Sequence, residues 1–152
     1  MRAVIQRVKK ASVSAEGQIT GRIEQGLLVF LGIGRDDSRA DIDFIADKIT
    51  NLRIFEDKDG KMNLSVRDIG GGILLVSQFT LYGDCRRGRR PDFSAAGTPQ
   101  MAKILYQQTI DVLRRSQLAV ETGVFAAYMI VDAVNDGPVT LIIDSKKDIK
   151  KL

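Results

Sequence analysis

The stretch VNDGPVTL, residues 134–141, raises the first question about the fold. It lies between two apolar runs, MIVDAV (129–134) and VTLIIDS (139–145), whose β-branched residues are typical of strands. Asn-Asp-Gly between such runs predicts a hairpin turn that pairs them. Pro138 follows that turn at once, although proline removes a backbone donor where pairing should resume. Turn formation alone therefore does not explain this proline.

The rest of the chain alternates between strand and helix patterns. Ser38 with Asp41 is typical of a capping box that opens a helix over about 39–51. Thr98 with Pro99 predicts the N-cap and first turn of a second helix, to about Ser116. Strands are predicted over 2–15, 16–26, 27–34 and 73–81, with a strand, an Asp-Gly turn and a return over 52–66.

Apolar residues at helical spacing indicate which face of each helix meets the core. The sequence predicts a single α/β domain over residues 1–152, with a mostly antiparallel sheet or partial β-barrel packed on two main helices. The apolar faces are Ile42, Phe44, Ile45, Ile49 and Leu52 in the first helix, and Met101, Ile104, Leu105, Ile110, Val112 and Leu113 in the second.

Composition limits the class of protein. The 152 residues carry 23 Lys and Arg against 19 Asp and Glu, a net charge of +4, which tilts weakly towards an anionic partner. No apolar run approaches the roughly 20 residues of a membrane span, and MRAVIQRVKK has no apolar signal-peptide core. The single Cys85 excludes an internal disulfide and fits a reducing compartment. We therefore expect a cytoplasmic protein with no membrane partner.

The chain contains no histidine. Its absence excludes Ser-His-Asp and Cys-His catalysis and any histidine general base. With one cysteine and no histidine, the usual zinc sites are excluded too, and we expect neither a metal nor a cofactor. A hydrolase built from this sequence must move its protons by other means.

Two segments are candidates for chemistry. SQFTL (77–81) places Ser77, Gln78 and Thr80 at the end of an apolar strand, where alternation puts Gln78 and Thr80 on one face. They form either a polar pocket or a strand end that emerges into solvent. The loop YGDCRRGRRPDFSAAG (82–97) is either a phosphate-binding loop or a solvated charged loop, and we expect its cysteine to be inert. Its arginines are Arg86, Arg87, Arg89 and Arg90.

Together these segments resemble a known family. IQRV, GLLVFLGI, RIFEDKDGKMNLSV, VSQFTLYGD, RPDFSAA and VNDGPVTLIIDS fall in the order and spacing of the D-aminoacyl-tRNA deacylases. The resemblance covers nearly the whole chain, and SQFTL with NDGPVT is its specific pair. Tyr128 stands where we expect an acidic residue in that family, and the DIKKL tail runs past the family's usual end.

The resemblance implies the family's fold and its activity, which is hydrolysis of the ester bond of D-aminoacyl-tRNA and of mischarged glycyl-tRNA. It implies a homodimer with active sites at the subunit interface. The SQFTL pocket of one subunit receives Gly137 and Pro138 of the other, which are joined by a cis peptide bond. Proline is the residue at which such a bond is least costly, which accounts for Pro138. Fixed carbonyl oxygens there reject L-aminoacyl groups.

The resemblance also implies a mechanism without histidine. The 2′-hydroxyl of the terminal ribose lies beside the ester and handles the proton. The backbone N–H groups of Phe79 and Thr80 stabilise the oxyanion, Gln78 holds the ribose or adenine, and Ser77 supports the strand end. In an alternative mechanism Thr80 is the nucleophile, but the sequence offers no evident base to activate it. We expect the four arginines of the loop to bind tRNA and to take no part in the chemistry.

Two further functions stay open. If the isolated chain has no activity of its own, it is a non-catalytic tRNA-binding domain, such as an editing domain attached to another enzyme. It is a nucleic-acid binder if the arginine loop binds DNA as readily as RNA, with no dependence on the aminoacyl group. The deacylase interpretation instead predicts aminoacyl-tRNA as the partner and no DNA.

Overall fold

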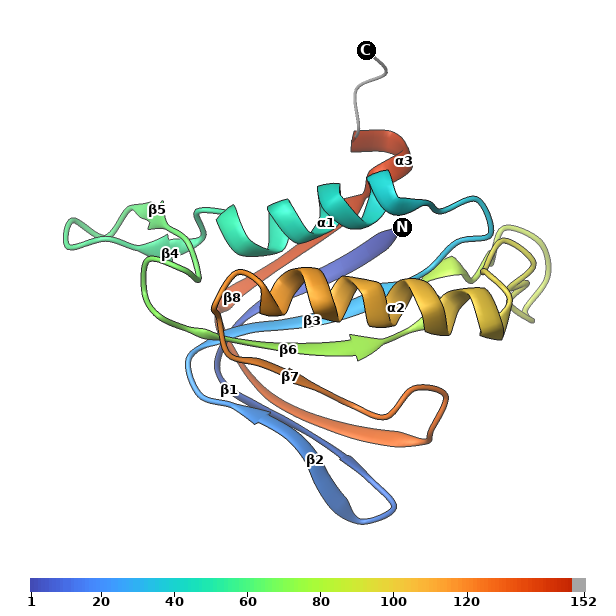
Figure 1. Ribbon diagram of the computed structural model, residues 1–152, viewed down its shortest axis with the longest axis horizontal. Helices are drawn as coiled ribbons and strands as arrows, with labels where there is room; N and C mark the ends of the chain where they lie inside the picture. Colours follow the sequence, from blue (N-terminus) through green and yellow to red (C-terminus); the bar gives the residue numbers. More distant parts are fainter. Residues whose placement is uncertain (149–152) are drawn as a thin grey trace.

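A mixed sheet of six strands forms the centre of the molecule, which a computed structural model describes over residues 1–148 (Figure 1). The order is β2-β1-β3-β6-β7, and β8 pairs with β1. β1 is antiparallel to β2, β3 and β8, whereas β6 is parallel to β3 and β7. The strands are β1 (Arg2–Ala15), β2 (Gln18–Ile23), β3 (Gly26–Gly32), β6 (Gly72–Ser77), β7 (Val120–Thr122, which was not predicted) and β8 (Met129–Asp144).

The sheet curves until its first and last strands approach each other. A Cβ added to Gly21 of β2 would lie 2.7 Å from the carbonyl oxygen of Thr122 in β7, so only glycine allows this approach. The predicted partial barrel is therefore confirmed. The predicted strand, turn and return over 52–66 is also confirmed, as the short antiparallel pair β4 (Phe55–Glu56) and β5 (Met62–Leu64).

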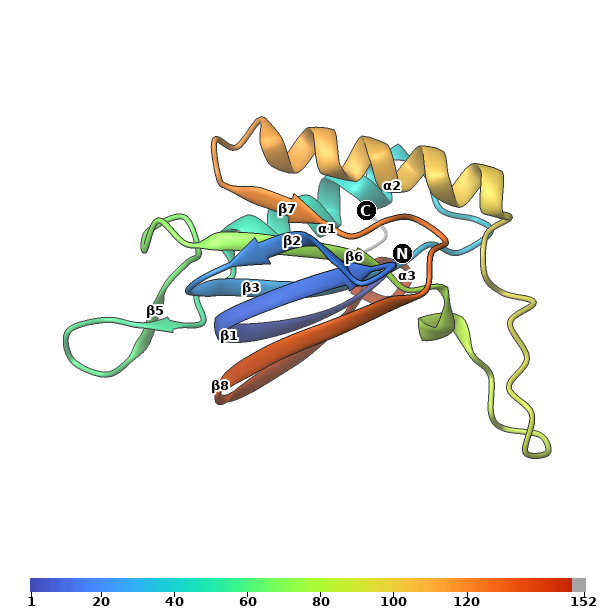
Figure 2. The ribbon, with the colours of Figure 1, turned by 90° about the horizontal axis from the view of Figure 1, so that it is seen from below.

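Two helices, α1 (Arg39–Asn51) and α2 (Pro99–Arg114), cover one face of the sheet (Figure 2). The predicted caps are confirmed, because the Ser38 N–H donates to the Asp41 carboxylate at 2.8 Å and Thr98 Oγ1 accepts from the Met101 N–H at 3.4 Å. α2 ends slightly before its predicted end, at Arg114. A short helix, α3 (Ser145–Asp148), follows β8 and was not predicted, and residues 149–152 of the DIKKL tail lie outside the described part.

The main core lies between these helices and the sheet. The predicted face of α1 is buried, with Ile42, Ile45 and Ile49 fully enclosed. The predicted face of α2 is partly wrong, because Ile104 is exposed and Tyr106 is buried in its place. The Tyr106 hydroxyl reaches the carbonyl oxygen of Leu75 at 2.7 Å, so its polar end is satisfied inside the core.

The predicted pairing of 129–134 with 139–145 is wrong. Both runs belong to β8 and pair in turn with β1, from Ala15 opposite Met129 to Arg2 opposite Asp144. Between them the ladder is interrupted, since Gln6 pairs with Thr140 and Val8 with Asn135. Residues 136–139 therefore form a bulge, in which Pro138 costs no ladder hydrogen bond. The predicted local hairpin does not form, because the 14-residue β1 is long enough to pair with both runs and this long-range pairing is the one that the structure has.

A buried carboxylate joins the start of α1 to the C-terminal helix. Asp41 accepts hydrogen bonds from Ser145 Oγ at 2.5 Å and Lys146 Nζ at 2.9 Å. Burial by itself raises the pKa of this carboxyl, but the hydrogen bonds from Ser145, Lys146 and Ser38 outweigh it and hold the pKa well below its ordinary value of 3.8. The charged form of Asp41 is therefore stabilised in the folded protein.

We expect Asp41→Asn to lower the free energy of unfolding near pH 7 by about 3 kcal/mol, because a hydrogen-bonded buried charge is lost. Since the folded-state pKa is depressed, the stabilisation is complete above the unfolded-state pKa and falls as pH drops through the folded-state value. Urea unfolding of both proteins between pH 7 and pH 2 should show the difference shrinking below about pH 4. A difference that stays constant with pH would contradict this account.

Candidate active site

An apolar cavity of about 590 Å³ opens beyond the C-terminal end of β6. It lies between that strand end, the first turn of α2 and the segment that leads into β8. Three predicted site residues, Ser77, Gln78 and Phe79, form its edge. Its other walls are mostly apolar and include Ile33, Val76, Phe93, Ala102, Phe125, Ala127, Tyr128, Met129 and Val131.

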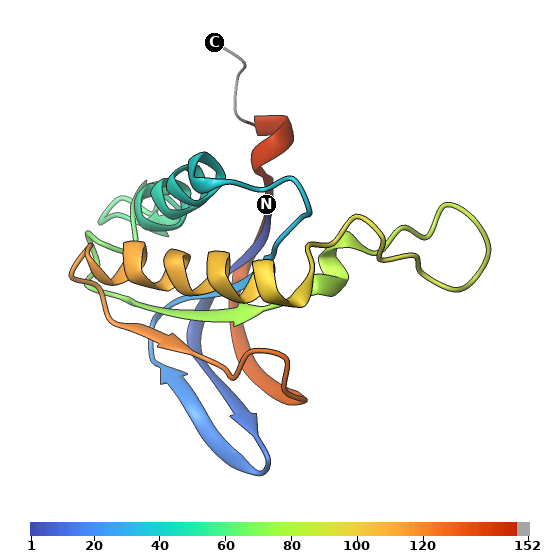
Figure 3. The same cartoon turned by 45° about the vertical axis from the view of Figure 1, so that its right-hand side comes forward.

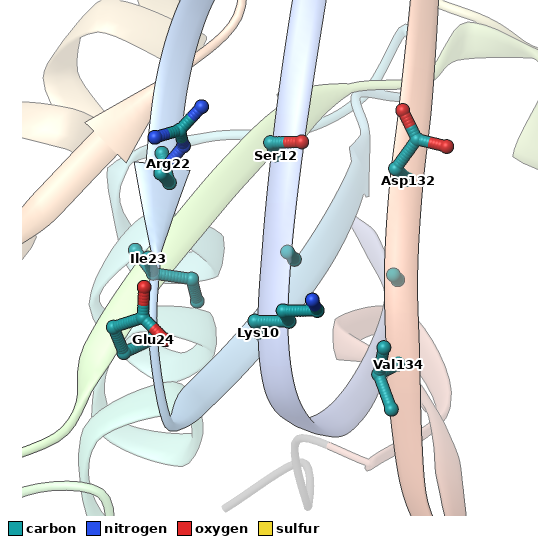
Figure 4. Close-up of a pocket in the computed structure, with 9 residues that line it drawn as sticks. Lys10, Ser12, Arg22, Ile23, Glu24, Asp132 and Val134 are labelled. Carbon is teal, nitrogen blue, oxygen red and sulfur yellow. The ribbon is translucent and has the colours of Figure 1, made fainter.

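A second groove lies on the outer face of β2, β1 and β8 (Figure 4). It has a volume of about 460 Å³ and contains none of the predicted site residues. Side chains of both charges lie across its strands, with Arg22 and Asp132 on either side of Ser12, and Lys10 near Glu24. Because its charges balance and no main-chain donor was predicted to face it, we place the active site at the apolar cavity.

The SQFTL segment leaves the sheet earlier than predicted. Ser77 is the last residue of β6, and the Gln78 N–H donates to the carbonyl oxygen of Leu31 at 2.8 Å. The chain then turns into the 3₁₀ helix η1 (Phe79–Tyr82). Strand alternation therefore does not place Gln78 and Thr80 on one face, as was predicted. The turn brings them together instead, and the Gln78 amide donates to the Thr80 hydroxyl oxygen.

The start of η1 supplies main-chain donors at the edge of the cavity. The first N–H groups of a helix have no acceptor within it. In residues 1–148, no described hydrogen bond uses the N–H of Phe79 or Thr80. Arg2 holds the far end of this turn, because its Nη1 donates to the carbonyl oxygen of Leu81 at 3.0 Å and its guanidinium lies 4.5 Å from the Tyr82 ring centre. The two N–H groups are thus fixed and available to a ligand.

Within residues 1–148, the described contacts of the Thr80 hydroxyl include no general base. The Thr80 side chain is exposed, and within the described residues the hydrogen-bond partner of its hydroxyl is the Gln78 amide. An amide nitrogen cannot take a proton from the hydroxyl, so this contact does not activate Thr80 as a nucleophile. The geometry agrees with the mechanism that assigns its main chain, rather than its side chain, to the chemistry.

The predicted arginines lie at the tip of a long loop away from the cavity (Figure 3). The N–H groups of Asp84 and Asp92 each donate to the other's carbonyl oxygen, at 2.7 and 3.0 Å, and close the base of this tip. The Arg86 guanidinium binds the Asp84 carboxylate through both oxygens and lowers the pKa of that carboxyl to about 2. The other three, Arg87, Arg89 and Arg90, have no acidic partner within residues 1–148.

The predicted cis peptide bond between Gly137 and Pro138 is confirmed. Both residues are exposed in the bulge of β8, and Gly137 has a φ of 120°, which side chains rarely adopt. Figure 1 shows the bend of β8 at the opposite end of the sheet from the C-terminal end of β6. One chain therefore does not bring Gly137 and Pro138 to its own cavity.

Arg7 holds the bulge in place through hydrogen bonds, and the sequence did not predict this role. This buried arginine donates from Nε to the carbonyl oxygen of Asp136 at 3.2 Å and from Nη1 to that of Ile54 at 2.7 Å. Its Nε also lies 3.3 Å from the Asp136 carboxylate. The sequence could have predicted that Arg7 is buried, because alternation along β1 places its side chain on the same face as Ala3 and Ile5.

Several cavity walls were also missed. Phe93 packs edge-to-face on Phe79, with 5.1 Å between ring centres, and belongs to the quoted motif RPDFSAA, to which no role was given. Phe125 and Met129 carried no recognisable signal. In residues 1–148, no group of three or more metal-ligating side chains is arranged around a common point, and no helix is both long and apolar enough to cross a membrane.

The fold and the cavity together define a class of protein, namely a single α/β domain whose candidate site offers main-chain donors instead of a catalytic triad. The family model described as D-Tyr-tRNA(Tyr) deacylase matches residues 4–144, and the chain belongs to this family.

Individual relatives agree with this assignment. D-aminoacyl-tRNA deacylases of Fervidobacterium nodosum and Thermosipho africanus are each 60% identical over 147 residues, which is 97% of this chain and 99% of the relative. A solved structure titled c-Myc DNA Unwinding Element Binding Protein has a TM-score of 0.89 at 42% identity, covering 95% of this chain and 99% of that one. A structure titled as that of a probable eukaryotic D-amino acid tRNA deacylase has a TM-score of 0.81 at 15% identity, covers 93% of this chain and 97% of that one, and supports the fold alone.

Proposed function

We propose that this protein hydrolyses the ester bond of D-aminoacyl-tRNA, and of mischarged glycyl-tRNA, and releases the free amino acid and tRNA in the cytoplasm. The observation that carries the proposal is a pair of adjacent N–H groups, on Phe79, which lines the apolar cavity, and on Thr80, which follows it; no hydrogen bond described within residues 1–148 uses either group. Such donors stabilise the oxyanion that forms when an ester carbonyl is attacked. The apolar walls accept the terminal adenosine, with Gln78 beside the ribose or adenine and Ser77 supporting the turn.

We propose that the active enzyme is a homodimer. A two-fold interface joins the same surface on both subunits, so features at opposite ends of that surface meet across it. The bulge with Gly137 and Pro138 lies in the middle of β8, where that strand bends at one end of the sheet, and the cavity lies beyond the other end. The outward surface between them includes Ile142, which is 77% exposed. Pairing two copies through this surface carries each bulge towards the partner's cavity and covers the exposed isoleucine.

In this arrangement the partner's Gly137 and Pro138 form the wall that selects chirality. A D-aminoacyl group or glycine turns its α-hydrogen towards the carbonyl oxygens of that wall. An L-aminoacyl group turns its side chain into the wall instead. Selection therefore works by exclusion of the wrong substrate, which gives larger ratios than binding an apolar side chain.

A matched deacylation assay tests the activity directly. We expect purified full-length protein to hydrolyse D-aminoacyl-tRNA more than about a hundredfold faster than the L-aminoacyl form of the same tRNA. Spontaneous hydrolysis of each substrate without protein is the control. Equal rates for the two forms would remove the chirality proposal, and no rate above the control would favour the non-catalytic tRNA-binding domain.

We propose that the arginine loop binds the tRNA and takes no part in the chemistry, because its tip lies away from the cavity. A solved structure of 42% identity has a title that refers to DNA, so DNA is the competing ligand to test. Replacing Arg87, Arg89 and Arg90 by Ala should weaken tRNA binding and reduce the slope of log affinity against log salt by about 2 to 3. Turnover of saturated enzyme should not change.

Arg86→Ala is the matched control for this loop, since Asp84 already neutralises that guanidinium. We expect Arg86→Ala to reduce tRNA affinity less than a single substitution of Arg87, Arg89 or Arg90 by Ala. The measurement is filter binding at several salt concentrations. Unchanged affinity in the triple variant would make the loop a solvated surface. Equal affinity for single-stranded DNA and tRNA would favour the nucleic-acid-binding alternative.

A further inference from the structure

One large side chain at the mouth of the cavity has no role in the proposed chemistry. Tyr128 lines the cavity, yet its surface is 84% exposed. The neighbouring aromatic residue Phe125 turns inward, with its ring centre 5.8 Å from that of Tyr106, and Met129 packs on a separate core cluster that includes Val13 and Leu74. Tyr128 therefore stands free of the core while the residues around it are anchored.

Another part of the cavity lining is also aromatic and is joined to positive charge. Phe79 is 56% exposed and is supported edge-to-face by Phe93. Phe93 lies on the returning arm of the arginine loop, which projects away from the cavity and carries Arg87, Arg89 and Arg90, for which no acidic partner is described within residues 1–148. Exposed aromatic rings followed by positive charge are the features that bind single-stranded nucleic acid, whose bases stack on the rings while the phosphates meet the cations.

We propose that the ring of Tyr128 is a stacking platform for the base of the nucleotide that precedes the terminal adenosine of the tRNA. The inference rests on the proposed function, because it requires the terminal adenosine inside the cavity with its ester at the N–H groups of Phe79 and Thr80. Tyr128 lies at the rim, so it meets the part of the strand that has just left the cavity. Its hydroxyl is not needed for stacking.

Binding of uncharged RNA tests the platform without relying on activity. The probe is an RNA hairpin with a single-stranded CCA end, and its comparison lacks only the penultimate base. We expect removal of that base to weaken binding to the full-length protein about tenfold. Tyr128→Ala should weaken binding of the intact probe to the same extent and show no further loss with the abasic probe. Tyr128→Phe should behave as the unsubstituted protein.

Ile130→Ala is the matched control, because Ile130 is a nearby residue of the same segment, 55% exposed, and does not line the cavity. It should bind both probes as the unsubstituted protein does. If Tyr128→Ala still distinguishes the two probes tenfold, the platform lies elsewhere and the proposal is overturned. A lower oligomeric state of Tyr128→Ala in sedimentation would also overturn it, since the ring would then be a subunit contact.

Kinetics separate this site from the rest of the substrate. With D-aminoacyl-tRNA, Tyr128→Ala should raise KM about tenfold and leave kcat unchanged. With D-aminoacyl-adenosine, which has no preceding nucleotide, it should change neither parameter. Equal effects on both substrates would assign the ring to the adenosine or the amino acid and contradict the proposal. If the unsubstituted protein hydrolyses neither substrate, the proposed function fails, while the two hairpins still decide whether Tyr128 stacks on the penultimate base.

Discussion

A D-aminoacyl-tRNA whose terminal ribose lacks the 2′-hydroxyl should bind this protein normally, but its hydrolysis should be slower by a factor of about a thousand. The chain has no histidine, and the described contacts of Thr80 include no base. The 2′-hydroxyl lies next to the ester by covalent geometry, so no entropy is lost in placing it there. The measurement is single-turnover deacylation at saturating enzyme, with affinity determined separately on the uncharged RNA.

Thr80→Ala is the companion variant. The substitution keeps the backbone N–H that is proposed to stabilise the oxyanion, and it removes the hydroxyl that accepts from Gln78. We expect it to retain activity to within about tenfold, the value of one neutral hydrogen bond. An inactive Thr80→Ala enzyme, together with a deoxy substrate that forms a trappable acyl-enzyme, would instead establish Thr80 as the nucleophile.

Two separately inactive variants should restore activity when their subunits are mixed. Gly137→Ala disrupts the bulge, because its φ of 120° disfavours a side chain and an added Cβ would lie 2.9 Å from Arg7 Nη2. Ala102→Trp fills the cavity from α2. Each homodimer should lose nearly all activity. A mixed dimer joins the intact bulge of one subunit to the intact cavity of the other, and so contains one complete site.

The expected recovery is quantitative. After unfolding and refolding of an equal mixture, about half of the dimers are mixed, and each has one working site of two. Activity should therefore reach about a quarter of that of the unsubstituted protein. Gly60→Ala is the matched control for the glycine substitution, because Gly60 also has a positive φ but an added Cβ meets nothing within 4 Å. No recovery in the mixture, with dimers present by gel filtration, would place the complete site within one subunit.

The sequence by itself determined the elements whose signals are local. The caps at Ser38 and Thr98 and the helical spacing of Ile42, Ile45 and Ile49 predicted α1 and α2 to within a few residues. These features depend on contacts three or four residues apart, which neighbouring side chains specify without help from the rest of the chain. The fold and the cis bond between Gly137 and Pro138 were predicted differently, from the resemblance to a family and not from local physical signals.

Only the tertiary structure decided how these elements meet. Asn-Asp-Gly had the local signal of a hairpin, yet β1 pairs with both halves of β8 and forces 136–139 into a bulge. The apolar run into SQFTL predicted a strand to Leu81, but β3 offers its last partner at Leu31, opposite Ser77, so the ladder ends there and η1 begins. Arg7 supports the bulge through Asp136, far away in the sequence. Pairings of this kind depend on the free energy of the whole sheet, which no short segment encodes.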